Sequence, residues 1–415
     1  MDTKELYAGK IEIKSITVTN ISGVEFNITQ FVNELNIYED FTSCMVSGNL
    51  VINDTGAMIN QVGIIGHEKL KVVLKSPGMP ADVELVYLVS KMDNGTQVSP
   101  SHSVYLLHFV SYETLKNQLT KVAKSFKGNV ATIVKQIFSD TFNSNLMVGS
   151  TQTSLQFVSP YWTPFEVINW LSNKTIDAEG VPSFFFFANT LGYHFLPITE
   201  LYRQPPIINY TYRQMDVSGG ILNEKKYEYQ MQTVRNFKVI ENFNFIESLS
   251  RGLLAGELFV KDLTTNQYGR SDYNYLKVNN TFTHLNQMSI IPTGNAFGDN
   301  YIDNKSELRY ATTHSQIFDN YPSSTNVEHY VLNRISLIEA ISATRVQIQV
   351  PGHLELSIGK IINLEVPMTG SQERKMMDPT LSGRYLITAA RHIINGKSHE
   401  VVLELSKDSY TAKVN

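Results

Sequence analysis

Hydrophobic and polar residues alternate along most of residues 11–116. Alternation with a period of two is typical of half-buried β-strands, and glycine, asparagine and aspartate mark the turns between them. Such turn residues occur at Gly23, at 53–56 and at 93–95. The pattern therefore predicts a compact antiparallel barrel or sandwich over this part of the chain.

The hydrophobic period changes to that of helices between residues 117 and 225. An apolar stripe predicts a helix at 130–138, and Thr163, Pro164 and Glu166 are the residue types of a capped helix start. Two short apolar runs, at 184–187 and 192–196, predict a hairpin. We expect a small α+β domain here. Its first helical stripe consists of Val130, Ile133, Val134, Ile137 and Phe138.

One pattern occurs twice in the chain. Each copy has a strand from glycine to aspartate, a glycine before an apolar strand, a Tyr-Leu-Val or Tyr-Leu-Ile triplet, and a Ser-His pair that opens an alternating strand. An internal repeat constrains the whole architecture, so we expect two similar β-barrels. The copies occupy residues 48–54, 66–74, 87–89 and 101–109, and residues 256–262, 359–366, 385–387 and 398–405.

The second copy is interrupted after its first strand, which predicts an inserted subdomain. Within the insert, Thr325 and Glu328 suggest another capping box before a helix. The predicted stripe of that helix is Val331, Ile335, Ile338 and Ile341. The predicted fold is mainly β with α+β parts. Its divisions are a first barrel at 1–116, an α+β domain at 117–225, a split second barrel at 226–264 and 336–415, and an inserted subdomain at 265–335.

Composition supports this assignment and excludes some classes of protein. The 415 residues include 21 tyrosines and 21 phenylalanines, which favour sheets, and the net charge of −4 argues against a protein that coats nucleic acid. The single cysteine, Cys44, excludes an intramolecular disulfide framework. The first residues lack the apolar core of a signal peptide, so we expect a reducing cytoplasm. No run approaches the roughly 20 apolar residues of a membrane span, and we expect no membrane partner.

The residues offer no catalytic, cofactor-binding or metal-binding constellation. Cys44 is interpreted as a structural thiol in a strand-like run, because no activating base is indicated. His67-Glu68 lacks the second histidine of a zinc-protease helix, and no Gly-Lys-Ser/Thr follows Gly63 and Gly66. We therefore expect a non-enzymatic protein without a cofactor. The remaining candidates are interpreted as partly exposed strand histidines and turn aspartates. They are His102, His108, His392, His399, Asp54 and Asp262.

The second copy resembles a known family. It contains Pro351-Gly352, the runs 359–364 and 382–387, Arg391-His392, and the run 398–406. This is similar to the C-terminal tube-type barrel of phage tail hub proteins, a group that includes type VI secretion spike proteins. The helix start at 163–166 and the phenylalanine-rich hairpin resemble the second domain of the central baseplate hub of T-even-like contractile-tailed phages. The insert at 265–335 shows the least resemblance.

The resemblance implies a homotrimer that forms a ring around the tail axis. Because each chain would contribute two tube-type barrels, a threefold operator would produce pseudo-sixfold symmetry. Such a ring would adapt a threefold central spike to a sixfold tail tube and form part of the DNA channel. The implied partners are the spike protein, which often carries a cell-wall hydrolase domain, tube or tube-initiator proteins, and baseplate wedge proteins. DNA would pass through the lumen without specific binding. The implied location is the virion tail baseplate, assembled in the bacterial host cytoplasm.

Two other functions stay open at this point. A carbohydrate- or receptor-binding tail protein is also rich in strands and aromatic residues, and it would expose aromatic side chains on a concave face. A spike of the secretion type needs an OB-domain and a repetitive β-helix after the barrel. Because the sequence ends at Asn415, soon after the second copy, we expect the spike to be a separate protein.

Overall fold

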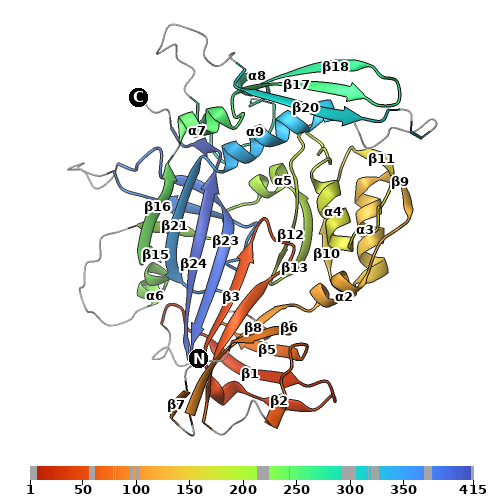
Figure 1. The fold of residues 1–415 in the computed structure, drawn as a ribbon. Helices are drawn as coiled ribbons and strands as arrows, with labels where there is room; N and C mark the ends of the chain where they lie inside the picture. Colours follow the sequence, from red (N-terminus) through yellow and green to blue (C-terminus); the bar gives the residue numbers. More distant parts are fainter. Residues whose placement is uncertain are drawn as a thin grey trace.

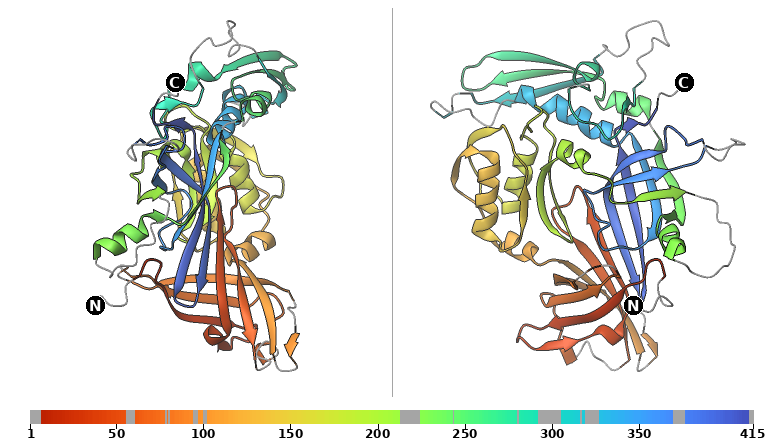
Figure 2. Two further views of the ribbon diagram at one scale, coloured as in Figure 1. Left: turned by 90° about the vertical axis from the view of Figure 1, so that its left-hand side faces the viewer. Right: turned by 180° about the vertical axis from the view of Figure 1, so that it is seen from behind.

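The structure is a computed structural model that describes residues 7–55, 61–77, 79, 81–93, 97–99, 102–212, 224–242, 244–279, 281–291, 305–315, 317–318, 327–368 and 376–412. It is mainly β, with large antiparallel sheets, as the sequence predicts. Figure 1 shows an N-terminal group of strands at the bottom, a C-terminal group above it on the left, and an α+β domain on the right. A small separate sheet lies at the opposite end from the N-terminal strands, and the two further views agree (Figure 2).

The N-terminal strands form one part of a 15-stranded sheet, and we call β1 to β8 the N-terminal half. Their order in space is β2-β1-β5-β6-β8-β4-β3, and each neighbouring pair is antiparallel. Alternate residues of β4, such as Leu50 and Ile52, are buried, as expected for a half-buried strand. The strands are β1 (Glu12–Thr19), β2 (Glu25–Asn27), β3 (Val32–Asp40), β4 (Ser47–Asp54), β5 (Lys69–Lys75), β6 (Val83–Asp93), β7 (Gln97–Ser99) and β8 (His102–Ser111), with the 3-10 helix η2 (Thr29–Phe31) before β3.

The C-terminal strands form the other part of the same sheet, which we call the C-terminal half. Five of them follow the order β22-β23-β24-β21-β16, which matches β5-β6-β8-β4-β3 of the N-terminal half. Every pair in both series is antiparallel, so the two halves share one topology over five strands. The elements are β14 (Asn209–Tyr212), α6 (Glu224–Met231), β15 (Thr233–Val234), β16 (Asn236–Asn242), β21 (Thr344–Pro351), β22 (Ile361–Glu365), β23 (Gly383–Asn395) and β24 (Ser398–Lys407).

One irregularity also recurs at matching positions of the two halves. In the β6–β8 pair, Val89 lies opposite Phe109 and the next pair is Lys91 with His108, so Ser90 is skipped. In the β23–β24 pair, the register skips Thr388 in the same way, directly after the pair of Ile387 with Leu405. A bulge fixes register, so this pair of bulges aligns the two halves residue by residue.

One segment of the predicted repeat is wrong. Residues 256–262 lie in β17 (Ala255–Asp262), which pairs with β18 (Tyr268–Asn274) and β20 (Glu307–Thr313) in a separate three-stranded sheet. The counterpart of β4 is β21, which resumes the sheet after the insert. The error has a physical origin, because alternation identifies a strand but not its partners. Closed barrels are not confirmed either, since no strand pairing between the described residues closes the large sheet.

The α+β domain confirms the helices and the hairpin predicted from the sequence. The Thr163 hydroxyl accepts a hydrogen bond from the Glu166 N–H, and the Glu166 carboxylate accepts one from the Thr163 N–H, so the capping box is present. The hairpin aligns Phe184 with Pro197 and Asn189 with Gly192. The elements are α2 (Glu113–Leu119), β9 (Ser125–Asn129), α3 (Val130–Thr141), β10 (Leu146–Val148), β11 (Ser154–Val158), α4 (Pro164–Ser172), β12 (Phe184–Asn189), β13 (Gly192–Pro197) and α5 (Ile198–Arg203).

The inserted segment contains the small sheet and the predicted helix. The predicted apolar stripe of that helix is wrong in part, because Ile338 is exposed and Leu332, Leu337 and Ala340 are buried. The buried face also contains Arg334 and Ser336, so apolar residues alone do not locate it. Thr325 of the predicted capping box lies outside the described residues. The elements are α7 (Phe245–Ser250), β17, β18 (Tyr268–Asn274), α8 (Tyr275–Asn279), β19 (Met288–Ser289), β20 (Glu307–Thr313), the 3-10 helix η4 (Val327–His329), α9 (Val331–Ile341) and, near the C-terminus, β25 (Ser409–Tyr410), which pairs with β19.

Three hydrophobic clusters form the interior. One joins the N-terminal half to the α+β domain, and a second joins the C-terminal half to the hairpin and α5. A third lies under the small sheet and α9. The first two clusters therefore cross the predicted boundaries of the domains, which stay a prediction. Among the described residues, no helix is long and apolar enough to cross a membrane.

Candidate assembly interface

The two halves are joined by direct pairing of β3 with β23 (Figure 1). The pairing is antiparallel and runs from Glu34 opposite Asn395 to Asp40 opposite Ala389. It continues past the strand end, where the Phe41 N–H donates to the Thr388 carbonyl at 2.8 Å. The two halves are thus one continuous sheet rather than two packed bodies.

Polar side chains fix the register of this junction. Asn36 is buried and donates to Glu34 Oε1 at 2.7 Å and to Asn49 Oδ1 at 3.0 Å. Its side-chain oxygen Oδ1 accepts from Arg391 Nε at 3.0 Å, across the junction. The Arg391 guanidinium also lies 5.6 Å from the centre of the Tyr38 ring, in cation–π range. A slip by one residue would move each of these groups to the other face, so the network specifies a single register.

Glu39 connects the junction to the α+β domain. Its side chain is buried, and Oε1 accepts from the Thr190 N–H at 2.7 Å, in the turn of the β12–β13 hairpin. Oε2 accepts from Ser357 Oγ at 2.7 Å and from the Ile358 N–H at 3.0 Å, in the loop before β22. One carboxylate therefore holds together the N-terminal half, the hairpin and the C-terminal half. The sequence gives no signal for this role, because the donors are distant in the chain.

His392 and His399 form a buried pair beside the junction, so their interpretation as partly exposed residues is wrong. His392 Nδ1 lies 3.0 Å from His399 Nε2, and both side chains are buried. Burial lowers the pKa of His392, against raising contributions from Glu39 and a backbone hydrogen bond. Burial lowers the pKa of His399 well below its ordinary value, and the nearby His392 and His353 lower it further. Both rings are therefore neutral in the folded protein at neutral pH.

We expect acid to destabilise the fold through this pair. Both folded-state pKa values lie below the unfolded value of roughly 6.5, so below that pH the unfolded chain binds more protons and stability falls. The limit is about 1.4 kcal/mol per pH unit for each histidine. His284 acts in the opposite direction, because its pKa is raised.

The measurement is chemical denaturation at pH 7.5, 6.5 and 5.5, together with NMR of the histidine ring protons. The ring signals of His392 and His399 should titrate only below pH 6.5, and a double change to asparagine should flatten the acid slope. Titration of either ring near pH 6.5 in the folded protein would contradict buried, neutral rings.

The other residues considered for chemistry are not brought together. Cys44 lies in the turn between β3 and β4, near the Phe186 carbonyl, and burial raises the pKa of its thiol to about 12. His67 is exposed, and His108 is paired with Asp93 at 2.9 Å. Asp54 and Asp262 end β4 and β17. No cluster of potential metal ligands occurs among the described residues.

One Asp–His contact escaped the sequence analysis. His284 Nδ1 lies 2.7 Å from Asp408 Oδ2, and Nε2 lies 2.6 Å from the Asn279 carbonyl. Burial lowers the pKa of this imidazole, but the hydrogen bond and charge of Asp408 outweigh it and the net pKa is raised. Both ring nitrogens face acceptor oxygens within the fold, so neither is directed toward an external proton donor. The pair connects the insert to the residue that follows β24.

Known proteins share the fold of this chain. No known protein-family profile matches the chain. Its fold is that of phage tail proteins. It is similar to the tail protein from Neisseria meningitidis MC58, with a TM-score of 0.56, 11% identity, and coverage of 95% of this chain and 96% of the other. It is also similar to the 43 kDa tail protein of prophage MuSo2 from Shewanella oneidensis, with a TM-score of 0.53, 9% identity, and coverage of 96% and 98%.

A curated homologue is similar to the chain in sequence over nearly the full length of both proteins. The chain is 21% identical over 444 residues to the "Probable baseplate hub protein gp334" of Vibrio phage KVP40, and the alignment covers 97% of this chain and 96% of that protein. The resemblance to phage tail hub proteins, predicted from the residues of the second copy, is thereby confirmed.

Proposed function

We propose that the chain is the structural hub of a contractile-tail baseplate and works as a homotrimeric ring. The observation that carries the proposal is the repeated five-strand series, joined edge to edge through β3 and β23. The near full-length similarity to a probable baseplate hub protein supports it. The proposal keeps the four-part division of the chain, except that residues 255–262 belong to the insert.

The duplication supplies the symmetry of the proposed ring. A chain with two similar halves, arranged head to tail around a threefold axis, presents six similar units around the ring. Such a ring matches a sixfold tube on one face, while the insert and the α+β domain retain the threefold symmetry of a spike on the other. Adapting one symmetry to the other is the function that we assign to the duplication.

The proposed partners follow from that position. They are a central spike protein, tube or tube-initiator proteins, and surrounding wedge proteins, and the lumen forms part of the DNA channel. The net charge of −4 suits a channel that must not hold DNA. The chain itself is proposed to be non-enzymatic, assembled in the host cytoplasm and carried in the virion baseplate.

The mass of the assembly tests this proposal. Native mass spectrometry of the full-length chain, alone at rising concentration and with its spike protein, should show a species of three chains. A chain that stays monomeric in both conditions, or that forms a true hexamer, would contradict the symmetry adapter.

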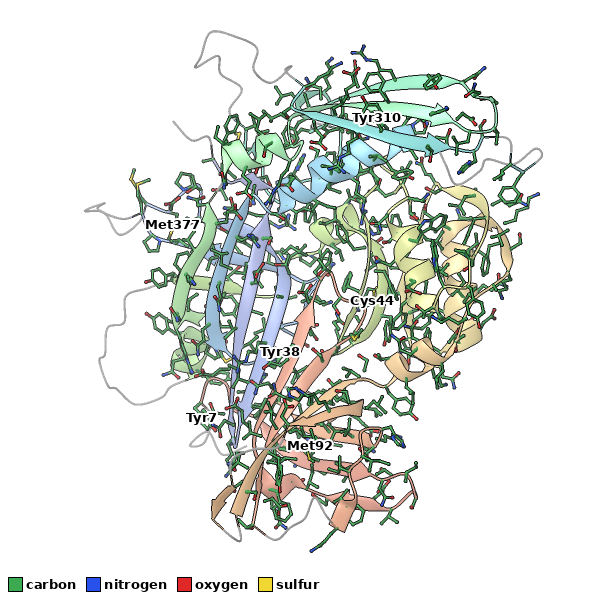
Figure 3. All side chains as sticks on the ribbon, in the orientation of Figure 1. Tyr7, Tyr38, Cys44, Met92, Tyr310 and Met377 are labelled. Carbon is green, nitrogen blue, oxygen red and sulfur yellow. The ribbon has the colours of Figure 1, made fainter. Side chains whose placement is uncertain are left out.

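One observation favours the second candidate, a carbohydrate- or receptor-binding tail protein. The outer face of the small sheet exposes Tyr268, Tyr310 and Phe259, and the rings of Phe259 and Tyr310 stack at 5.5 Å. Figure 3 shows Tyr310 on this sheet, far from Tyr38 at the junction. Aromatic faces are common at binding surfaces. This face is compatible with a hub that carries a peripheral binding surface, so the position of the chain in the assembled particle, around the axis or only at the periphery, decides between the two functions.

A further inference from the structure

One edge of the large sheet has an unpartnered strand, β16. Within the described residues, β16 pairs only with β21, and its other edge is open. Val239 and Ile240 are each 39% exposed there, whereas Leu35 and Ile37 of the matching strand β3 are 0% and 1% exposed. Unlike β16, β3 is paired with β23 on its second edge. An exposed apolar edge strand is a site for pairing with another chain.

A second open edge lies on β6. Its first part, up to Leu88, pairs with β5, and no described strand pairs on that side with the rest, residues 90–93. In the matching strand β23, the corresponding part is occupied by β3. Figure 3 shows Met92, in this open part of β6, well apart from Tyr38 at the occupied junction. In the C-terminal half, this part of β23 is therefore paired with β3, whereas the matching part of β6 in the N-terminal half has no such partner among the described residues.

The register of the β3–β23 junction predicts which residues would lie opposite each other if the open edges of β16 and β6 were paired. The shared bulges match Val89 with Ile387, and therefore Asp93 with Arg391. Phe109 of β8 and Leu405 of β24 occupy matching positions, and they lie opposite Gly48 and Val346, so these two residues also match. Ile37 lies opposite Gly48 and Val239 lies opposite Val346, so Ile37 matches Val239. One residue of β16, Ile240, is skipped in its pairing with β21, which matches Tyr38 with Glu241. The internal pair of Arg391 with Tyr38 therefore corresponds to Asp93 with Glu241.

We propose that the open edge of β16 pairs antiparallel with residues 90–93 of β6 in a second copy of this chain, with Glu241 opposite Asp93. This inference rests on the proposed ring and gives it a residue-level interface. The partner is a second copy because the internal junction already shows this pairing between matching strands. The contact is head to tail, so it uses two different surfaces and closes at the copy number that the rotation sets.

The charges at the proposed junction are compatible with it. Glu241 Oε2 lies 2.7 Å from Arg345, and Asp93 Oδ1 lies 2.5 Å from Lys91. Arg345 also lies 3.8 Å from Glu404, and Asp93 also lies 2.9 Å from His108. Each of the two opposed carboxylates would therefore keep a basic partner on its own chain. Two like charges without such partners would destabilise a cross-strand pair.

Engineered cysteines test the pairing directly. In a Cys44→Ser background of the full-length chain, Asp93→Cys combined with Glu241→Cys should form disulfides between copies, because opposite residues of an antiparallel pair have Cα atoms about 4.5–5.5 Å apart. Under oxidation, the covalent ladder in denaturing gels should stop at three copies. Tyr38→Cys with Arg391→Cys is the matched positive control, since its disulfide should form within one chain. Asp93→Cys with Tyr310→Cys is the negative control.

A second variant keeps the test independent of disulfide chemistry. Val239→Lys places a charge on an edge that is already exposed in the single chain, so thermal unfolding of the isolated chain should be unchanged. Its trimer should dissociate at a concentration at least about tenfold higher than that of the unmodified chain, because a buried apolar contact is lost and a charge is introduced.

The outcomes separate this inference from the proposed function. A ladder that stops at three supports both. A trimer in the mass measurement without the Asp93–Glu241 disulfide, or with Val239→Lys assembling normally, overturns the strand pairing and leaves the hub proposal standing. A chain that never trimerises overturns the ring and the pairing together. A ladder longer than three shows an open filament and also overturns the closed interface.

Discussion

Replacing Glu39 by alanine is expected to lower the free energy of unfolding by about 3 kcal/mol, because each buried donor left without an acceptor costs roughly 1–3 kcal/mol. The carboxylate accepts from Thr190, Ser357 and Ile358, and the change leaves these three donors without an acceptor in the interior. Because the donors belong to the hairpin and to the C-terminal half, the loss should also loosen the contact between the parts of the chain.

Chemical denaturation of the purified chain measures this loss, and hydrogen exchange at the Thr190 and Ile358 amides localises it. Glu12→Ala is the matched control, since Glu12 is an exposed strand carboxylate and its removal should change stability by less than about 0.5 kcal/mol. Equal, small effects of the two changes would show that Glu39 does not hold the junction together.

Replacing Gly48 by alanine is expected to cost about 3 kcal/mol, at the upper end of overpacking effects. A Cβ atom there would lie within 3.0 Å of both the Asn36 carbonyl oxygen and the Phe109 ring. The carbonyl belongs to β3, which is held between β4 and β23, and it has no room to move. The alanine would therefore push β3 against the β3–β23 junction.

Gly269→Ala is the control for the intrinsic effect of alanine in a strand. Gly269 also lies in a strand, and an added Cβ would meet only Val260, at 3.9 Å. The free energies of unfolding of the two variants should differ by more than about 2 kcal/mol, in favour of Gly269→Ala. If Gly48→Ala unfolds at the same denaturant concentration as the unmodified chain, the close approach of β3 and β4 at this point is wrong.

Local features of the fold could be predicted from the sequence. The capping box of Thr163 and Glu166, the stripe of α3, and the hairpin at 184–197 depend on residues close together in the chain. Their patterns contain the structural information, because helix caps and amphipathic faces are local. The matches of β5, β6 and β8 with β22, β23 and β24 were also recognisable, since the glycines and the alternation recur in the same order.

Features set by distant partners could not be predicted. Residues 256–262 have the pattern of β4, yet β18 and β20 recruit them into a separate sheet. The burial of His392 and His399 follows from their contact with each other and with the loop around Gly352, where a Cβ would lie within 3.0 Å of the His399 ring. Glu39 has no local sign of its role. In each case the deciding partner lies on another strand or loop, and strand periodicity does not identify it.

In the proposed assembly, three copies of the chain, each with two matching halves, form one ring at the base of the tail tube. Electron microscopy of the assembled particle, averaged without imposed symmetry, tests it most directly. We expect three copies of the chain and six similar strand units around a central channel, with threefold symmetry in the outer domains. A ring of six chains, or density for this chain only at the periphery of the baseplate, would contradict it.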